Sequence, residues 1–427
     1  FSFGAEKADV WVRIGAIQKE KLGDAQASLK SYQRASDFDP ANVKAASALK
    51  AVFVGRGDHG ATLQMLRREI EATEGALAKA RLFTEMGRIY RQDLKDVGKA
   101  IEHYEKAFKS DPTSMEAGEP LAELYRENGR WDDANKIFEH FSESAGAMKK
   151  EKALELFLRY GEASLKMNDL EKAKRAFSKA REIDPKDGYS LERFAHTMFE
   201  MKDWKTANAA YADYLLRFSD TLEKSDKVAM TMRVATCCKE LDELPRALEM
   251  LGKAVEIDPD HLPAYRMKMA IHEKRQEWDE TVQNIRNVME YVNDAERFDL
   301  LIRAGDILKD RLGDDDKASK SYGSALEIKP DHRATLLKLV QLYMKLEKWQ
   351  KVVEVVLPLA DLVEDKKELA TYYKTAAQLC DQYLGRKDDA LSYYEAAIEN
   401  DATQLDLLDC IGNILTDIAY AYLDPRV

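Results

Sequence analysis

Residues that could carry catalytic or metal chemistry are sparse and scattered along this 427-residue chain. Its seven histidines never stand four residues apart, and its four cysteines form no C-x-x-C pair, although zinc sites use ligands at such short spacings. The chain also lacks the G-x-x-x-x-G-K-[ST] phosphate loop and the G-x-S-x-G nucleophile turn. We therefore predict no catalytic residue, no metal and no cofactor, and a protein that is not an enzyme.

Three short strings have a simpler explanation than ligand binding. Arg56-Gly57-Asp58 matches an integrin-type tripeptide, and residues 313–317 match a fragment of a calcium loop. The calcium-like string lacks the alternating ligands and terminal Glu of an EF-hand, and Gly followed by Asp is typical of a turn before a helix. Residues 1–4, FSFG, match a nuclear-pore-type motif, which occurs only once. We assign no binding to any of them.

The composition favours helices and limits the class of partner. Glycine and proline number only 20 and 10, which disfavours strand-and-turn folds. A formal charge of −11 disfavours nucleic acid, because such affinity comes mostly from Lys and Arg that neutralise phosphates. No segment approaches the ~20 consecutive apolar residues of a membrane helix. Four cysteines are too few for a disulfide scaffold, so we expect buried thiols and a cytoplasmic protein.

An internal repeat of about 72 residues organises the chain. Asp-Pro or a close variant recurs at intervals of 72, 73, 74, 71 and 72 residues, beginning at Asp39, Asp111, Asp184, Asp258, Lys329 and Asp401. Eight residues before the second residue of each mark stands a large apolar residue: Tyr32, Tyr104, Phe177, Leu251, Tyr322 and Tyr394. Further upstream stand small residues, at Gly15, Gly87, Gly161, Ala235, Gly305 and Ala377. We expect one helix to approach another closely at each of these small residues.

A second set of recurring residues divides each 72-residue repeat into two helix pairs. Tryptophans recur at intervals of 73, 74 and 71 residues, at Trp131, Trp204, Trp278 and Trp349, and His59 takes the equivalent place before them. Each tryptophan precedes an amphipathic run with apolar residues three and four positions apart, which predicts a helix. The chain is therefore predicted to alternate two kinds of helix pair.

These recurring positions resemble the tetratricopeptide repeat family over essentially the whole chain. Tyr160-Gly161 followed by Ala173, Phe177 and Pro185 is similar to the small and large signature of that family. The resemblance implies an all-α, right-handed superhelical solenoid of stacked antiparallel helix pairs, with the first helix of each pair lining a concave groove. It also implies a scaffold that binds proteins or peptides and has no catalytic activity.

We predict a single solenoid over residues 1–427 with about eleven and a half repeats. Their bounds are 9–42, 43–76, 80–114, 115–148, 154–187, 188–221, 228–261, 262–295, 298–332, 333–366 and 370–404, with a half repeat over 405–427. Prolines are expected between helices. Aspartates are expected to cap the second helices by accepting their first-turn N–H groups, at Asp24, Asp96, Asp169, Asp203, Asp242 and Asp314.

Position within the repeat places a group of arginines beside a group of glutamates in the expected groove. Aromatic residues, which are typical of peptide anchors, lie next to them. Our partner-binding candidates are Arg81, Arg88, Arg91, Glu119, Glu123, Arg126, Glu162, Tyr189, His196 and Phe199. A solvated helix face without a partner is the alternative. A carboxylate clamp for heat-shock chaperones is disfavoured, because that clamp needs Asn after the small glycine and this chain has Ala16, Arg88, Glu162 and Asp306 there.

The last predicted helix is more apolar than a terminal cap that faces water. Its apolar residues are Leu407, Leu408, Ile411, Ile414, Leu415, Ile418, Tyr420, Tyr422 and Leu423. We expect further chain, a partner or a second copy to cover it, and self-association is one possibility. The chain starts at Phe1 without an initiator Met, so we expect a segment of a longer protein. The alternative function is then a regulatory or substrate-recruiting arm of a larger enzyme or transport machine.

Overall fold

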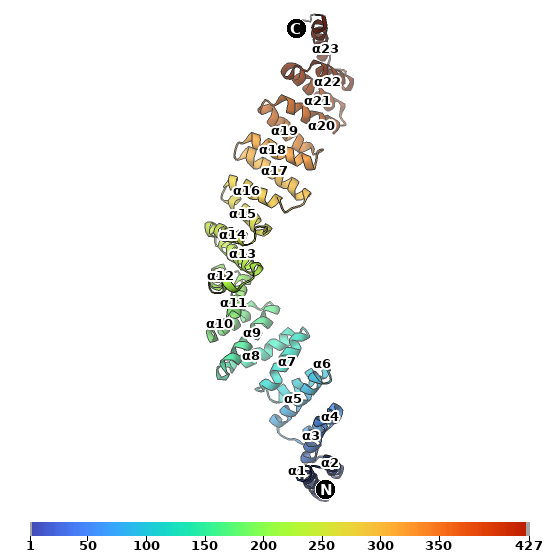
Figure 1. The fold of residues 1–427 in the computed structure, drawn as a ribbon, viewed down its shortest axis with the longest axis vertical. Coiled ribbons are helices and arrows are strands. Elements are labelled where there is room, and N and C mark those ends of the chain that lie inside the picture. Colours follow the sequence, from blue (N-terminus) through green and yellow to red (C-terminus); the bar gives the residue numbers. More distant parts are fainter. Residues whose placement is uncertain (1, 424–427) are drawn as a thin grey trace. The chain divides into compact units, whose positions relative to one another are not determined.

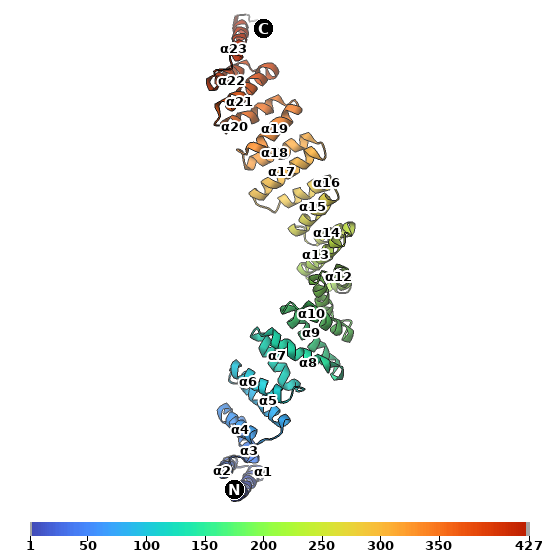
Figure 2. The ribbon, with the colours of Figure 1, turned by 180° about the vertical axis from the view of Figure 1, so that it is seen from behind.

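Helices joined by short connectors make up the structure, a computed structural model that describes residues 2–423. No β-strand occurs within this described range. The chain separates into two compact units, the first ending at Phe218 and the second beginning at Ser219. In each unit, helices that follow one another in sequence are neighbours in space (Figure 1, Figure 2).

The first unit consists of six helix pairs. They are α1 (Ser2–Glu20) with α2 (Ala25–Phe38), α3 (Val43–Gly55) with α4 (His59–Ala72), α5 (Ala76–Gln92) with α6 (Val97–Ser110), α7 (Met115–Glu127) with α8 (Trp131–Glu143), α9 (Lys150–Lys166) with α10 (Leu170–Ile183), and α11 (Gly188–Glu200) with α12 (Trp204–Phe218). A short 3-10 turn, Ala145–Ala147, lies between α8 and α9.

The second unit continues the same pattern and ends on a single helix. Its elements are α13 (Lys224–Glu240) with α14 (Leu244–Ile257), α15 (Leu262–Lys274) with α16 (Trp278–Met289), α17 (Asp294–Asp310) with α18 (Asp315–Ile328), α19 (Arg333–Lys345) with α20 (Trp349–Asp361), α21 (Lys366–Leu379) with α22 (Lys387–Asn400), and α23 (Asp406–Leu423). A π-helical turn, Cys380–Leu384, follows α21.

The two predicted kinds of helix pair are present, and they differ in the length of the first helix. That helix has 17 residues in α5, α9, α13 and α17, but 13 residues in α7, α11, α15 and α19. The longer helices begin four residues before the predicted starts, for example at Ala76 and not at residue 80. The second helices α8, α12, α16 and α20 begin at the tryptophans, as predicted.

The turn inside each helix pair contains a residue in the left-handed conformation. Glycine takes this place at Gly23, Gly57, Gly129, Gly313 and Gly385, and other residues take it at Lys95, Asn168, Lys202, Asp242, Gln276 and Glu347. Asp58 follows Gly57 and accepts a hydrogen bond from the Ala61 N–H at the start of α4. Backbone geometry therefore explains the integrin-like string.

Five of the six predicted aspartate caps are confirmed. Asp24, Asp96, Asp169, Asp203 and Asp314 each accept a first-turn backbone N–H. The prediction for Asp242 is wrong, because this residue has φ 61° and occupies the left-handed place one position before the cap. Glu243 takes the cap position without a side-chain hydrogen bond.

The expectation that prolines lie between helices is wrong at four described positions, because Pro245 and Pro263 lie in the first turns of α14 and α15 and two others lie deeper in a helix. Pro120 lies inside α7 and Pro358 lies inside α20. A proline cannot donate to the carbonyl four residues earlier, so these helices lack the bonds to Glu116 and Glu354. Both glutamates are exposed, and water can therefore satisfy the freed carbonyls.

The predicted contacts between small and large residues form the core of the helix pairs. A Cβ atom added to Gly15, Gly87 or Gly305 would lie within 3.0 Å of the ring of Tyr32, Tyr104 or Tyr322, respectively. At Gly161 the added atom would lie 2.5 Å from Cζ of Phe177, which is fully buried. These glycines are therefore required by packing.

His103 gives the first unit a predicted sensitivity to acid. Its ring is buried between Phe83 and Tyr90, with ring centroids 6.2 and 5.2 Å away. Burial, followed by the nearby charge of Lys106, lowers the pKa of His103 below its ordinary 6.5. The unfolded chain therefore takes up the proton first, and stability is lost as the pH falls below about 6.5.

We expect the melting temperature to fall between pH 7 and pH 5, and the His103→Phe variant to show a smaller fall. Thermal unfolding followed by circular dichroism at each pH measures this difference. An equal fall in both proteins would assign the acid sensitivity to other groups.

Candidate partner-binding site

Three predicted arginines converge on one cavity of about 420 Å³ in the first unit. Arg81, Arg88 and Arg91 line it from α5, while Glu116 and Pro120 line it from α7. We call it the arginine cavity. Its other lining residues are Thr84, Glu85, Gln92 and Tyr104. Arg81 and Arg88 are exposed, and neither has an ion-pair partner within residues 2–423.

The first helices of neighbouring repeats are joined by ion pairs, and this explains why other predicted groove charges are not available. In the first unit these pairs are Lys50–Glu85 at 3.1 Å, Arg91–Glu123 at 3.2 Å, Arg159–Glu123 at 2.9 Å and Arg193–Glu162 at 2.5 Å. Pairs of this partly exposed kind each contribute about 0–1 kcal/mol. Their main effect is to neutralise charge along the face that the first helices form, which we call the first-helix face.

The second unit has the same arrangement on its own first helices. Its pairs are Arg303–Glu273, Lys338–Asp306, Arg333–Glu368 and Lys374–Asp406. Each joins residues 30 to 35 positions apart, which is about one repeat. Charged residues on a first helix therefore often recognise the next repeat.

One ion-pair group engages Glu85, a lining residue of the arginine cavity. The ammonium group of Lys50 on α3 lies 3.0 Å from Glu69 on α4 and 3.1 Å from Glu85 on α5. The Glu69 side chain is only 4% exposed, and its Oε1 has no hydrogen-bond partner. Because Lys50 engages Glu85, this carboxylate offsets less of the positive charge of Arg81 and Arg88.

Glu162 and Tyr189 are brought together, but they bind each other. Arg193 donates two hydrogen bonds to the Glu162 carboxylate, at 2.5 and 3.1 Å, and the Tyr189 hydroxyl donates a third at 2.8 Å. Burial and then this hydrogen bond raise the pKa of Tyr189 to about 12, so the hydroxyl keeps its proton. A partner would have to displace this pairing in order to use Glu162.

The remaining candidates have mixed surroundings. Phe199 packs against Trp204 and Tyr211 of α12, with ring centroids 5.2 and 6.2 Å away, so packing occupies much of it. His196 lies 3.7 Å from Glu200 on the same helix. Arg126 lines a second cavity of about 300 Å³ with Glu123, Glu127 and Trp131, and its Nε is buried without a partner. Glu119 is half-buried.

Sequence reasoning missed the partners that neutralise the groove charges. Arg159 and Arg193 were not among the candidates, although each binds a predicted acidic residue on the preceding first helix. The spacing contained the signal: Glu123 and Arg159 are 36 residues apart, and Glu162 and Arg193 are 31 apart. A search for opposite charges about one repeat apart would have found both pairs.

The terminal helix α23 has one buried face and one exposed apolar face. Leu407 and Ile414 are buried against the preceding repeat, whereas Leu408 and Leu415 are about half exposed. The side chains of Tyr420, Tyr422 and Leu423, which the sequence prediction included, lie outside the described residues. Self-association through this helix stays a prediction.

Other chemistry-bearing groups were also located. The side chains of Cys237, Cys238 and Cys380 are buried, as predicted, and that of Cys410 is half-buried. Burial raises the pKa of Cys237 to about 12. Between Ser2 and Leu423, no group of three His, Cys, Asp or Glu side chains is placed to hold a metal ion. No helix of the described part combines the length and apolar character needed to cross a bilayer.

Comparisons with known proteins agree with the helical repeat. Residues 62–196 match the family described as soluble NSF attachment protein, SNAP, and residues 298–332 match the tetratricopeptide repeat. The second match has the bounds that we predicted for one repeat. Superkiller protein 3 of Schizosaccharomyces pombe is 25% identical over 256 residues, which cover 58% of this chain and 17% of that protein.

A second curated relative and a solved structure have weaker or shorter similarity. Hsp70-Hsp90 organizing protein 3 of Arabidopsis thaliana is 25% identical over 255 residues, which cover 48% of this chain and 45% of that protein. The chain therefore spans less than half the length of either relative. A structure of Naa15/Naa10 bound to HypK-THB is 14% identical, covers 95% of this chain and 65% of that chain, and has a TM-score of 0.46.

Stacked antiparallel helix pairs with a fixed small and large register define an α-solenoid. The helix pairs, the match of residues 298–332 and the similar proteins support an array of tetratricopeptide repeats, as the sequence predicted. Such arrays are in general protein-interaction scaffolds and not catalysts. The handedness of the array and its continuity over residues 1–427 as a single solenoid stay predictions.

Proposed function

We propose that this chain is a non-catalytic scaffold that holds an acidic segment of a partner protein in the arginine cavity and so assembles a multiprotein complex. One observation carries the proposal. Within the described residues 2–423, Arg81 and Arg88 lack ion-pair partners on a first-helix face where Arg91, Arg159 and Arg193 are paired to neighbouring repeats. Unpaired guanidinium groups that share a cavity favour a carboxylate, which they can bind in bidentate fashion.

The charge balance of the cavity supports an acidic partner. Three arginines line it against two glutamates, and one of these, Glu85, is paired with Lys50. Pro120 leaves the carbonyl of Glu116 without its helical donor.

We do not extend a chaperone-clamp role to this chain from its similarity to an Hsp70-Hsp90 organizing protein. Arg88 stands directly after Gly87, and Glu162 stands directly after Gly161, where the clamp requires Asn. Glu162 is also bound to Arg193 and Tyr189. An acidic side chain or segment fits the arginine cavity better than a clamped chain terminus.

A second candidate is a regulatory or substrate-recruiting arm of a larger enzyme or of a transport machine. The match of residues 62–196 to soluble NSF attachment protein favours it. The mass of the natural protein separates the two candidates. A cytoplasmic location and the lack of a nucleic-acid partner remain predictions of either one.

Affinity capture tests the proposal with three immobilised proteins. The first is the wild-type chain, the second carries Arg81→Glu and Arg88→Glu, and the third carries Arg13→Glu and Lys19→Glu on α1 as a matched charge change. Arg13 and Lys19 are exposed and have no ion-pair partner within residues 2–423. We expect at least one acidic partner that the first and third proteins retain and the second loses. Equal capture by all three would refute the site.

A further inference from the structure

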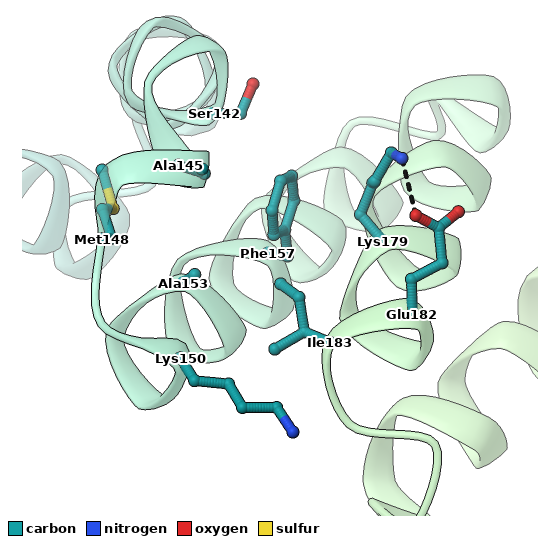
Figure 3. A pocket seen from close by; sticks show the side chains of 10 residues that line it. Ser142, Ala145, Met148, Lys150, Ala153, Phe157, Lys179, Glu182 and Ile183 are labelled. Carbon is teal, nitrogen blue, oxygen red and sulfur yellow. Dashed lines mark hydrogen bonds and ion pairs between the residues drawn. The ribbon is translucent and has the colours of Figure 1, made fainter.

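A third cavity, of about 660 Å³, opens where α8 passes into α9 (Figure 3). Its walls come from the end of α8 with the turn Ala145–Ala147, from the first turns of α9 and from the last turn of α10. We call it the connector cavity. None of its lining residues belongs to the arginine cavity.

The connector cavity arises from a long connector with small side chains. Residues 144–149 separate α8 from α9, so the connector has six residues. The corresponding connector has three residues between α4 and α5, and four between α16 and α17 and between α20 and α21. Ala145, Gly146 and Ala153 line the opening, and these residues leave the volume that larger side chains would fill.

The lining combines an apolar base with one unpaired positive charge. Phe157 of α9 and Ile183 of α10 supply the apolar surface, as Figure 3 shows. Lys179 donates to Glu182 at 2.7 Å, so these two charges offset each other. Lys150 is exposed, and it has no ion-pair partner within the described part of the chain. The net charge available to a ligand is therefore positive.

We propose that the connector cavity binds a partner peptide in which a large apolar side chain lies next to an Asp or Glu carboxylate. The apolar side chain packs on Phe157 and Ile183, and the carboxylate pairs with Lys150. The volume agrees with this class of ligand, because binding pockets commonly enclose about 300–1,000 Å³. The unpaired charge of Lys150 selects an acidic peptide over a basic one. This site is separate from the proposed function, which rests on the arginine cavity.

A display library of random 12-residue peptides, selected on the whole chain, tests the proposal. Selected peptides are then measured against Gly146→Trp and Lys150→Glu. An added Cβ at Gly146 meets no atom within 4 Å, so the tryptophan can fill the opening without a backbone clash. Controls are Gly98→Trp on α6 and Lys166→Glu at the other end of α9, both at exposed positions. Arg88→Glu identifies peptides that bind the arginine cavity.

We expect one class of peptides to pair a large apolar residue with an acidic one. These peptides should bind Gly146→Trp and Lys150→Glu roughly 10- to 100-fold more weakly, and bind the two controls and Arg88→Glu as they bind the wild type. The proposal is overturned if no such class is selected, or if its binding survives Gly146→Trp. It is also overturned if the wild-type chain shows concentration-dependent sedimentation that Gly146→Trp abolishes, because a second copy would then be the occupant.

Discussion

Replacing Gly161 with alanine should lower the free energy of unfolding by about 1–3 kcal/mol. The added Cβ would lie 2.5 Å from Cζ of Phe177, and the ring is fully buried and cannot move into solvent. Helix propensity alone predicts the opposite sign, because alanine is favoured over glycine by about 1 kcal/mol inside a helix. Urea unfolding followed by circular dichroism measures the change. The sign of the result therefore separates packing from propensity.

Two further variants make this prediction specific. Gly323→Ala on α18 is the control, since a Cβ there meets no atom within 4 Å, and it should be neutral or stabilising. Phe177→Leu should recover part of the loss in the Gly161→Ala background, because the chain itself combines Ala235 with Leu251 at the equivalent places. If Gly161→Ala and Phe177→Leu change the free energy of unfolding by strictly additive amounts, the contact between residues 161 and 177 is contradicted.

Replacing Lys50 with methionine should lower the free energy of unfolding by about 3–5 kcal/mol. The change leaves the Glu69 carboxylate, which is 4% exposed, without its cationic partner. Burial opposes the charged form of Lys50, but its hydrogen bonds to Glu69 and Glu85 and the charges of both outweigh it, so its pKa lies above 10.5. The stabilisation is therefore present at neutral pH and is lost only as the pH rises above that value.

Two further variants test whether the unpaired Glu69 carboxylate is responsible for the loss. Glu69→Gln should restore stability in the Lys50→Met background at pH 7, and Lys44→Met at an exposed place on α3 should have little effect. If Glu69→Gln does not restore stability in that background, lost packing of the Lys50 side chain, and not the unpaired carboxylate, is responsible.

The sequence predicted best those residues whose packing surroundings recur in each repeat of about 72 residues. The glycines that face Tyr32, Tyr104, Phe177 and Tyr322 were identified from spacing alone, and the structure confirms their close contacts. The register also located the helix starts at the tryptophans. It was less accurate for features that depend on one position in a turn, which is why Asp242 was assigned to a cap although it adopts a left-handed conformation.

The candidate site was harder to predict because the register gives the face of a residue but not its partner. Arg81, Arg88 and Glu162 all fall on first helices, yet Arg193 binds Glu162, whereas the two arginines have no ion-pair partner in the described part of the chain. Cavities depend on connector length and on small side chains at several separate places. Neither the arginine cavity nor the connector cavity is therefore visible in a single motif.

The dissociation constant of a captured acidic partner tests the account most directly. It should be measured at low salt against the wild type, against Arg81→Glu with Arg88→Glu, and against Arg13→Glu with Lys19→Glu. We predict that the cavity variant binds roughly 10- to 100-fold more weakly, that its affinity depends less on salt, and that the α1 variant binds as the wild type does. Equal weakening by both pairs of substitutions would contradict the account, because net charge and not the arginine cavity would then determine binding.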